Sequence, residues 1–240
     1  MKKTFALIAF SLVASFAVQA QDLCPDGNHP HLIDLGLPSG TKWACCNMDA
    51  KAPDLVGRYY SWGDTKPKYD YSGDNYTHLA KHTFRVYDPD MGSSTGEYYK
   101  SNIGKNIAAS EHDVAHVKWG GAWRMPTDAQ WLELMNECNR KWVTLSGVHG
   151  VLLTGANGNS IFLPAAGYRD GKSMTNGNDG YYRAANVKSE TYTDKYRTPS
   201  TGEYLYPFYL TFGENSWSVS YNNYYCQGFL VRPVVKPAKK

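Results

Sequence analysis

The stretch Trp119-Gly-Gly-Ala-Trp-Arg-Met-Pro-Thr-Asp-Ala-Gln-Trp131 says more about the fold of this chain than any other segment. Gly120 and Gly121 allow the backbone to turn where a side chain would clash. Thr127 stands at a helix N-cap position, and Gln130 three residues later completes a capping box. The stretch therefore predicts an extended run that leads directly into a capped helix.

The helix that follows Thr127 has one apolar face. Apolar residues recur at i, i+3, i+4 and i+7, the spacing of an amphipathic helix: Trp131, Leu134, Met135 and Cys138. We expect this helix to reach about Arg140. A shorter helix is expected before it, with Ser110 as its cap and with Val114 and Val117 facing inward.

Short strands are expected elsewhere. An opening strand over 31–37 ends at a Pro-Ser-Gly turn, and residues 64–104 form a long ordered excursion with little periodicity. The clearest hairpin joins 151–154 to 160–163 through Gly155-Ala-Asn-Gly158-Asn. Other extended pieces are expected at 43–47, 57–62, 180–185, 205–212, 217–221 and 229–235. This order predicts an α+β domain, with two helices in the N-terminal half and a meander of short antiparallel strands in the C-terminal half.

The first twenty residues have the pattern of a secretory signal peptide. Lys2 and Lys3 precede an apolar run, and Ala20 ends a small-residue cleavage site. No later segment approaches the roughly 20 apolar residues of a membrane span. We therefore expect an exported protein, periplasmic or at the cell surface. Its predicted parts are a signal peptide (1–20), an extension (21–31), one domain (32–235) and a basic tail (236–240).

The charge balance argues against a nucleic-acid partner. Of the 25 lysines and arginines two lie in the signal segment, which leaves 23 basic against 22 acidic residues. No basic stripe remains that could follow a phosphate backbone.

Five cysteines follow the signal segment: Cys24, Cys45, Cys46, Cys138 and Cys226. In an oxidising compartment two disulfides and one remaining thiol are the default expectation. Adjacent cysteines do not pair readily, because a vicinal bridge strains the peptide. Cys45 and Cys46 are therefore each expected to have a distant partner.

Five sequence blocks, taken in order, resemble the Fibrobacter succinogenes major paralogous domain family. They are Leu32–Asn47, Tyr60–Asp64, Trp119–Trp131, Ile161–Asp170 and Gly228–Val234. That family is similar to the formylglycine-generating-enzyme branch of the C-type-lectin-like fold. The resemblance implies an irregular α+β domain whose two ends lie side by side, and it implies no activity.

The resemblance also implies one disulfide. In the family one cysteine follows Trp-Ala-x and another lies late in the long helix, and these positions match Cys46 and Cys138. The other three cysteines, Cys24, Cys45 and Cys226, are additions of this chain and supply a second disulfide or a free thiol. Both Cys24–Cys226 and Cys45–Cys226 stay open as pairings.

An oxidase related to the formylglycine-generating enzymes would need two thiolates for a soft metal such as Cu(I). Only Cys226 lies in the corresponding C-terminal region. Histidines at metal-ligand spacing occur as His29/His31, His78/His82 and His112/His116, but no third ligand is evident. We therefore predict no metal site from these residues.

Calcium is the one cofactor left as an alternative. The loop Asn176-Gly-Asn-Asp179 offers oxygen ligands, although its spacing does not match an EF-hand. Turn chemistry alone accounts for these residue types. We predict no cofactor, and no nucleophile motif indicates an enzyme.

Arginines and tryptophans within the family blocks are expected to have structural roles. Arg124, Arg169 and Arg232 would pair with carboxylates or cap carbonyl groups. The tryptophans expected in the core are Trp43, Trp62, Trp119, Trp123 and Trp131.

These features together favour a non-enzymatic, exported binding or adhesion module that recognises a glycan or a protein. Tyrosine combines an apolar ring with a polar tip, which suits a binding surface. The expected ligand contacts lie in the tyrosine-rich loops: Tyr71, Tyr76, Tyr98, Tyr99, Tyr181 and Tyr182. The alternatives are a metal-dependent oxidoreductase that uses Cys226, and a structural component of a surface assembly.

Overall fold

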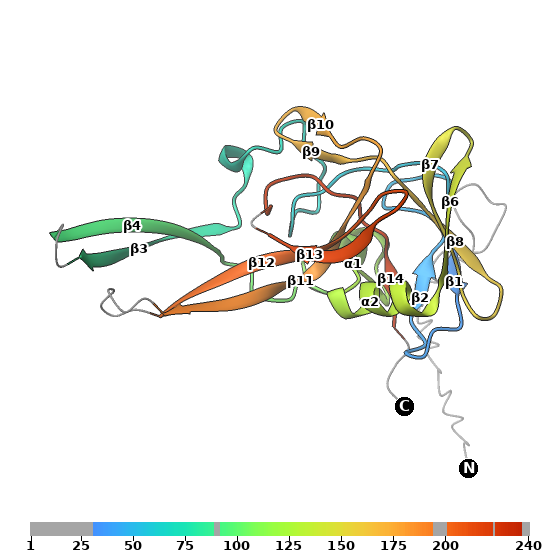
Figure 1. Ribbon diagram of the computed structural model, residues 1–240, viewed down its shortest axis with the longest axis horizontal. Coiled ribbons are helices and arrows are strands. Elements are labelled where there is room, and N and C mark those ends of the chain that lie inside the picture. Colours follow the sequence, from blue (N-terminus) through green and yellow to red (C-terminus); the bar gives the residue numbers. More distant parts are fainter. Residues whose placement is uncertain (1–30, 89–91, 194–200, 223, 237–240) are drawn as a thin grey trace, which may run out of the picture.

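The protein is mostly β, with two α-helices and one short 3-10 helix in the part of the chain that the computed structural model describes (Figure 1). Its strands form several separate antiparallel sheets, which confirms the predicted α+β class. The described residues are 31–88, 92–193, 201–222 and 224–236.

The predicted signal peptide and nearly all of the predicted extension lie outside the described residues, which begin at His31. Among the described residues, no helix combines the length and apolar character needed to cross a membrane.

A four-stranded sheet brings together segments from both ends of the domain. Its strands are β1 (Leu32–Asp34), β2 (Lys42–Ala44), β14 (Val234–Val235) and β5 (Trp123–Arg124), in that order. Every pair in it is antiparallel, and Val234 lies opposite both Trp43 and Arg124. The first and last strands of the domain, β1 and β14, therefore lie in one sheet, on either side of β2.

The predicted long helix is α2 (Asp128–Glu137), and its capping box between Thr127 and Gln130 is present as expected. It ends earlier than predicted, because the chain turns at Cys138 into the unpredicted strand β6 (Asn139–Leu145). Charged and half-exposed residues along β6 leave no apolar alternation that would have marked it as a strand.

The shorter helix α1 (Val114–Trp119) is capped by Asp113 and not by Ser110. Val114 is fully buried as predicted, whereas Val117 is 50% exposed, which corrects the prediction that it faces inward. The buried face of α1 is centred on Val114 and Ala115, and position 117 lies away from that face.

The predicted hairpin at 151–163 is confirmed as β7 (Val148–Thr154) and β8 (Ser160–Pro164), with β6 as the third strand of that sheet. A further small hairpin joins β9 (Tyr168–Asp170) to β10 (Ser173–Thr175).

Two long hairpins extend from the body in the same direction (Figure 1). One joins β3 (Leu79–Asp88) to β4 (Gly92–Ser101), after the short helix η1 (Gly73–Asn75). The prediction of an irregular excursion over 64–104 is therefore wrong in its second half. A two-stranded ribbon has no core face along most of its length, so its sequence need not alternate.

The second long hairpin joins β11 (Gly180–Thr193) to β12 (Thr201–Phe212), and β13 (Trp217–Tyr221) completes a three-stranded sheet. β11 and β12 are longer than the predicted strands, and the register shifts between Arg183 and Val187.

Tryptophans occupy the centre of the core. Trp131 of α2 packs against Trp43 of β2 with ring centroids 4.6 Å apart. Trp62 and Trp123 are also buried, as predicted, whereas Trp119 is half-buried. The helix α2 is thus anchored on the four-stranded sheet by aromatic packing.

The predicted structural role of Arg232 is confirmed. The side chain is fully buried. Its guanidinium donates to the carbonyl oxygens of Ala44, Cys45 and Phe162 at 3.0, 2.7 and 2.6 Å, and to Asn47 Oδ1 at 2.8 Å. One side chain thereby connects the end of β2 to β8.

The other two arginines predicted to have structural roles are Arg169 and Arg124. Arg169 lies 5.5 Å from the centroid of the Tyr59 ring. Arg124 is half-buried and lines a cavity of about 470 Å³ together with Lys236.

A second buried arginine, Arg183, was not predicted. Its guanidinium donates to the carbonyl oxygens of Tyr224 and Gln227 and lies 4.0 Å from the centroid of the Phe229 ring. Burial lowers the pKa of Arg183 to about 10.

The N-cap Asp113 provides the first test of this fold. Its buried carboxylate accepts hydrogen bonds from the backbone N–H groups of Ala109, Ala115, His116 and Met125. Asp113→Ala leaves these donors unpaired, so we expect the free energy of unfolding to fall by about 3 kcal/mol. Urea denaturation measures this loss.

The matched control is Glu111→Ala, because the Glu111 side chain is 87% exposed. We expect it to change the free energy of unfolding by less than about 0.5 kcal/mol. Equal effects of the two substitutions would contradict the assigned role of Asp113.

Candidate functional site

Three of the predicted ligand-binding tyrosines belong to the core. Tyr71, Tyr76 and Tyr182 are 3%, 7% and 0% exposed. Their hydroxyl groups donate to the backbone carbonyls of Tyr59, Trp62 and Pro164, respectively. These tyrosines fix loops to the body of the domain, so the prediction that they contact a ligand is wrong.

The other predicted tyrosines have different positions. Tyr98 and Tyr99 lie on β4, opposite His82 and Lys81, and their side chains fall outside what the structure describes. Tyr181 is half-buried, and its ring packs against others at centroid distances of 4.8 to 6.2 Å: Tyr168, Tyr209 and Phe229. The six tyrosines therefore do not form one site.

A different set of aromatic side chains gathers on one face of the β11–β12–β13 sheet. We call Tyr204, Tyr206, Phe208 and Tyr221 the aromatic strip. Successive rings along it lie 6.3, 6.1 and 5.6 Å apart, for Tyr204–Tyr206, Tyr206–Tyr221 and Tyr221–Phe208. Positions 204, 206 and 208 share a face because side chains alternate along β12, and Tyr221 joins them because it pairs with Phe208.

Charged groups border the aromatic strip. Lys188 lies opposite Tyr206 and Glu190 lies opposite Tyr204 across the β11–β12 pair. The hydroxyl of Tyr221 donates to Glu190 Oε1 at 3.0 Å, and this bond raises the pKa of Tyr221. Tyr221 is 43% exposed, whereas Tyr206 is half-buried and Phe208 packs partly against the main core cluster. The accessible part of the strip is therefore centred on Tyr221, with polar groups at its edge.

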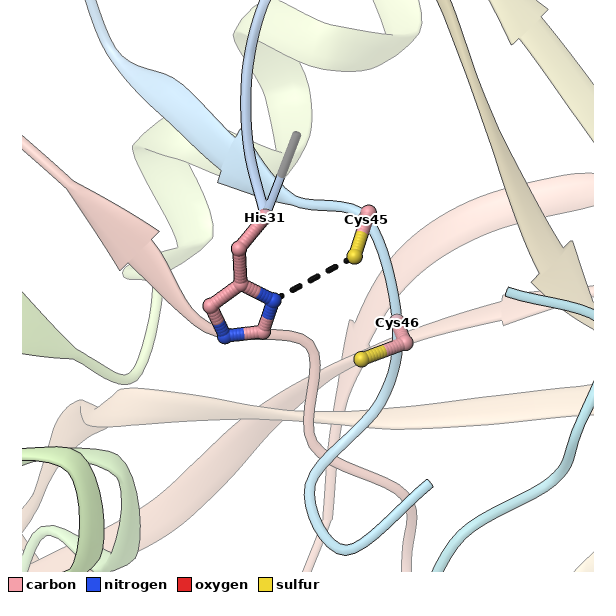
Figure 2. Close-up of side chains that lie close together, drawn as sticks. All are labelled: His31, Cys45 and Cys46. Atoms are coloured by element: carbon pink, nitrogen blue, oxygen red, sulfur yellow. Dashed lines mark hydrogen bonds between the residues drawn. The ribbon is translucent and has the colours of Figure 1, made fainter. Parts of the chain in front are cut away.

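A second arrangement is buried, beside the start of β1. Figure 2 shows the imidazole of His31 and the thiol groups of Cys45 and Cys46 directed toward one another. One ligand atom from each lies within 4.8 Å of the other two, and the side chains are 1%, 3% and 0% exposed. His31 Nδ1 is 3.3 Å from Cys45 Sγ.

The β1–β2 register explains how these three residues meet. Leu32 pairs with Ala44, so His31 lies opposite Cys45, whose N–H donates to the His31 carbonyl at 2.9 Å. In a regular strand Cys46 would point to the opposite face. The chain leaves β2 and bends at Cys45, which places both sulfur atoms on the same side. The sequence analysis did not predict this site. The available signal was a histidine at the start of one expected strand and a Cys-Cys pair at the end of the next, which an antiparallel pairing places opposite each other.

Aromatic rings and a positive charge surround this cluster. The rings of Trp119 and Trp123 lie 4.5 and 5.1 Å from the His31 ring. The pKa of Cys46 is lowered by a hydrogen bond from Cys45, and further by His31 and by the charge of Arg232, against desolvation that raises it. The surroundings therefore favour a thiolate at Cys46.

The disulfide between Cys46 and Cys138 that the resemblance implies is not formed. Cys138 is a buried free thiol at the end of α2, in the core cluster around Trp131. Cys46 belongs to a separate cluster with Cys45 and Ala50. The two sulfur atoms thus lie in different parts of the core, and this prediction is corrected.

Of the remaining cysteines, Cys226 is a half-buried free thiol, which matches one of its two predicted states. Cys24 lies outside the described residues.

Of the predicted histidine pairs, only His112/His116 has both side chains in the part of the chain that the structure describes, and it does not form as expected. His112 precedes α1, so His112 and His116 do not share a helical face. Instead the rings of His78 and His112 lie 5.0 Å apart, and His78 Nε2 lies 3.2 Å from Asp64 Oδ1. These residues, with Lys68, line an open pocket of about 290 Å³.

The loop considered for calcium is a closed turn, in which the N–H of Asp179 donates to the carbonyl of Asn176 at 3.0 Å. Calcium binding there stays a prediction that no observation tests.

Comparison of the chain with protein-family models, curated proteins and solved structures gives no match. The functional argument therefore depends on the residues of this chain and on their geometry.

Cys226 provides a test of these thiol assignments. It is the most accessible of the four described cysteines, so iodoacetamide should label it first in the native protein. Burial raises the pKa of Cys226 above its usual value and that of Cys138 to about 11. Since the thiolate reacts, labelling of Cys226 should accelerate about tenfold per pH unit between roughly pH 7 and 9.

Mass-spectrometric peptide mapping measures the labelling of each cysteine over time. Cys226→Ser should remove the fast phase of iodoacetamide labelling. Faster labelling of Cys138, or a disulfide-linked Cys226, would contradict the described arrangement.

Proposed function

We propose that the protein is an exported, non-enzymatic module that binds a glycan through the aromatic strip on a C-type-lectin-like scaffold. The observation that carries this proposal is the row of Tyr204, Tyr206, Phe208 and Tyr221 on one sheet face, at ring spacings of 5.6 to 6.3 Å.

The chemistry of the strip suits a sugar. A pyranose ring has an apolar C–H face and an edge of hydroxyl groups. The C–H face stacks on an aromatic ring, and the hydroxyl groups hydrogen-bond to side chains at the border. Lys188 and Glu190 supply a donor and an acceptor beside the rings. A row of rings, rather than one, favours a chain of several sugar units.

The rigidity of the strip also supports this use. Tyr206 and Phe208 are held by β12, which has a hydrogen-bonded strand on each side, and Glu190 holds the hydroxyl of Tyr221. Side chains that are already ordered lose little conformational entropy when a ligand binds.

Export is supported by the pattern of residues 1–20, and the scaffold by the five sequence blocks that resemble the family. The oxidoreductase alternative is less well supported, since it needs Cys226 beside a second thiol. Cys226 borders the core cluster around Tyr225, whereas Cys45 and Cys46 belong to a different one.

The test is a glycan array probed with residues 21–240. The double variant Tyr206→Ala/Tyr221→Ala removes two stacking surfaces, and we expect the affinity for any bound glycan to fall at least about 30-fold, equivalent to roughly 2 kcal/mol. Isothermal titration calorimetry with the best array hit measures the change. Repeating the array with chelator tests the calcium alternative.

The matched control is Tyr69→Ala. Tyr69 is 83% exposed but lies in a loop, outside the aromatic strip. Its loss should leave the affinity unchanged within about twofold. A blank array, or equal loss in the control, would overturn the assignment of the strip.

A further inference from the structure

We propose that His31, Cys45 and Cys46 bind one Cu(I) ion. This inference is independent of the proposed glycan site, because the cluster lies beside β1 and the aromatic strip lies on β12 and β13. Three features of the described residues support it: the spacing of the ligand atoms, their chemical type and the charge around them.

The spacing fits a small ion with three ligands. Three atoms placed about 2.3 Å from a central ion in a trigonal plane are roughly 4 Å apart. One ring nitrogen of His31 and the two Sγ atoms already lie within 4.8 Å of one another, and His31 Nδ1 is 3.3 Å from Cys45 Sγ. Small side-chain rotations are therefore enough to close the site around an ion.

The ligand types select a soft metal. Two thiolates and one imidazole suit Cu(I) and zinc, and they do not suit magnesium or calcium. Zinc takes four protein ligands in structural sites and three protein ligands plus a water in catalytic sites, whereas Cu(I) is satisfied by three ligands. The side chains of His31, Cys45 and Cys46 are buried, which limits the water that a zinc ion with three protein ligands keeps and so favours Cu(I).

The local charge also favours a monovalent ion. Arg232 is fully buried, and its hydrogen bonds go to uncharged oxygen atoms, two of them the carbonyls of Ala44 and Cys45. A Cu(I) ion with two thiolates carries one net negative charge, which balances the guanidinium. Zinc with the same ligands would be neutral and would leave the positive charge uncompensated.

Binding forms two Cu–S bonds and one Cu–N bond. It releases each proton that the two thiols still carry, and the copper stays Cu(I) throughout. The surroundings protect that state, because the ligands are buried and two tryptophan rings flank the imidazole. A geometry with three ligands and little access to water disfavours oxidation to Cu(II).

The experiment titrates the mature chain, isolated without reductant and handled anaerobically, with Cu(I) held by a chromogenic chelator. We expect uptake of one ion per chain. His31→Ala, Cys45→Ser and Cys46→Ser should each raise the apparent Kd at least about 100-fold, more than loss of an outer-shell partner would cost.

Cys138→Ser and Cys226→Ser are the matched controls, because both remove a thiol from elsewhere in the domain. These two substitutions should leave the apparent Kd for Cu(I) within about twofold of that of the unmodified chain. Retention of copper in the three cluster variants, or its loss in Cys226→Ser, would overturn the proposal.

X-ray absorption spectroscopy on the copper-loaded unmodified chain identifies the ligand atoms directly, so it tests the site even where a variant fails to fold. We expect a first shell of two sulfur atoms and one nitrogen. A shell of another composition overturns the site, and so does uptake of zinc in preference to copper. Peptide mapping that finds Cys45 or Cys46 in a disulfide in the isolated protein also overturns it.

Discussion

The buried guanidinium of Arg232 organises the region on which the rest of the domain depends. Its donors reach β2, the loop that follows β2, and β8, and all of its contacts are to uncharged oxygens. Removing such a group would leave several carbonyl oxygens unpaired in the core. Because its backbone belongs to the segment just before β14, the same residue helps to place the closing strand beside β2. A lysine could not replace it, since a single ammonium lacks the fork of donors.

The parts of the fold that the sequence predicted are those set by local chemistry. The capping box at Thr127, the hairpin over 151–163 and the buried tryptophans follow from residue type and spacing alone. The hairpin β3–β4 could not be predicted in this way, because a ribbon outside the core leaves no apolar period. The strand β6 was missed for a related reason, since its residues are largely exposed.

The candidate sites were harder to predict, because they depend on partners distant in the sequence. Tyrosine is common on binding surfaces, but the hydroxyl groups of Tyr71 and Tyr182 donate hydrogen bonds to backbone carbonyls on other segments. These bonds hold both side chains in the core. The aromatic strip required the pairing of Phe208 with Tyr221. Likewise, the position of His31 opposite Cys45 follows only once the β1–β2 register is known.

The place of β14 has a consequence for how the chain folds as it is made. This strand lies between β2 and β5, so two segments that emerge early from the ribosome cannot form their shared sheet until residues 234–235 have also emerged. The sheet is closed by contacts between residues almost 200 positions apart in the sequence, such as Trp43 with Val234. Contacts of such long range are slow to form. The nascent chain is therefore expected to reach its native state only after translation, and a chaperone that binds exposed tryptophans would have time to act.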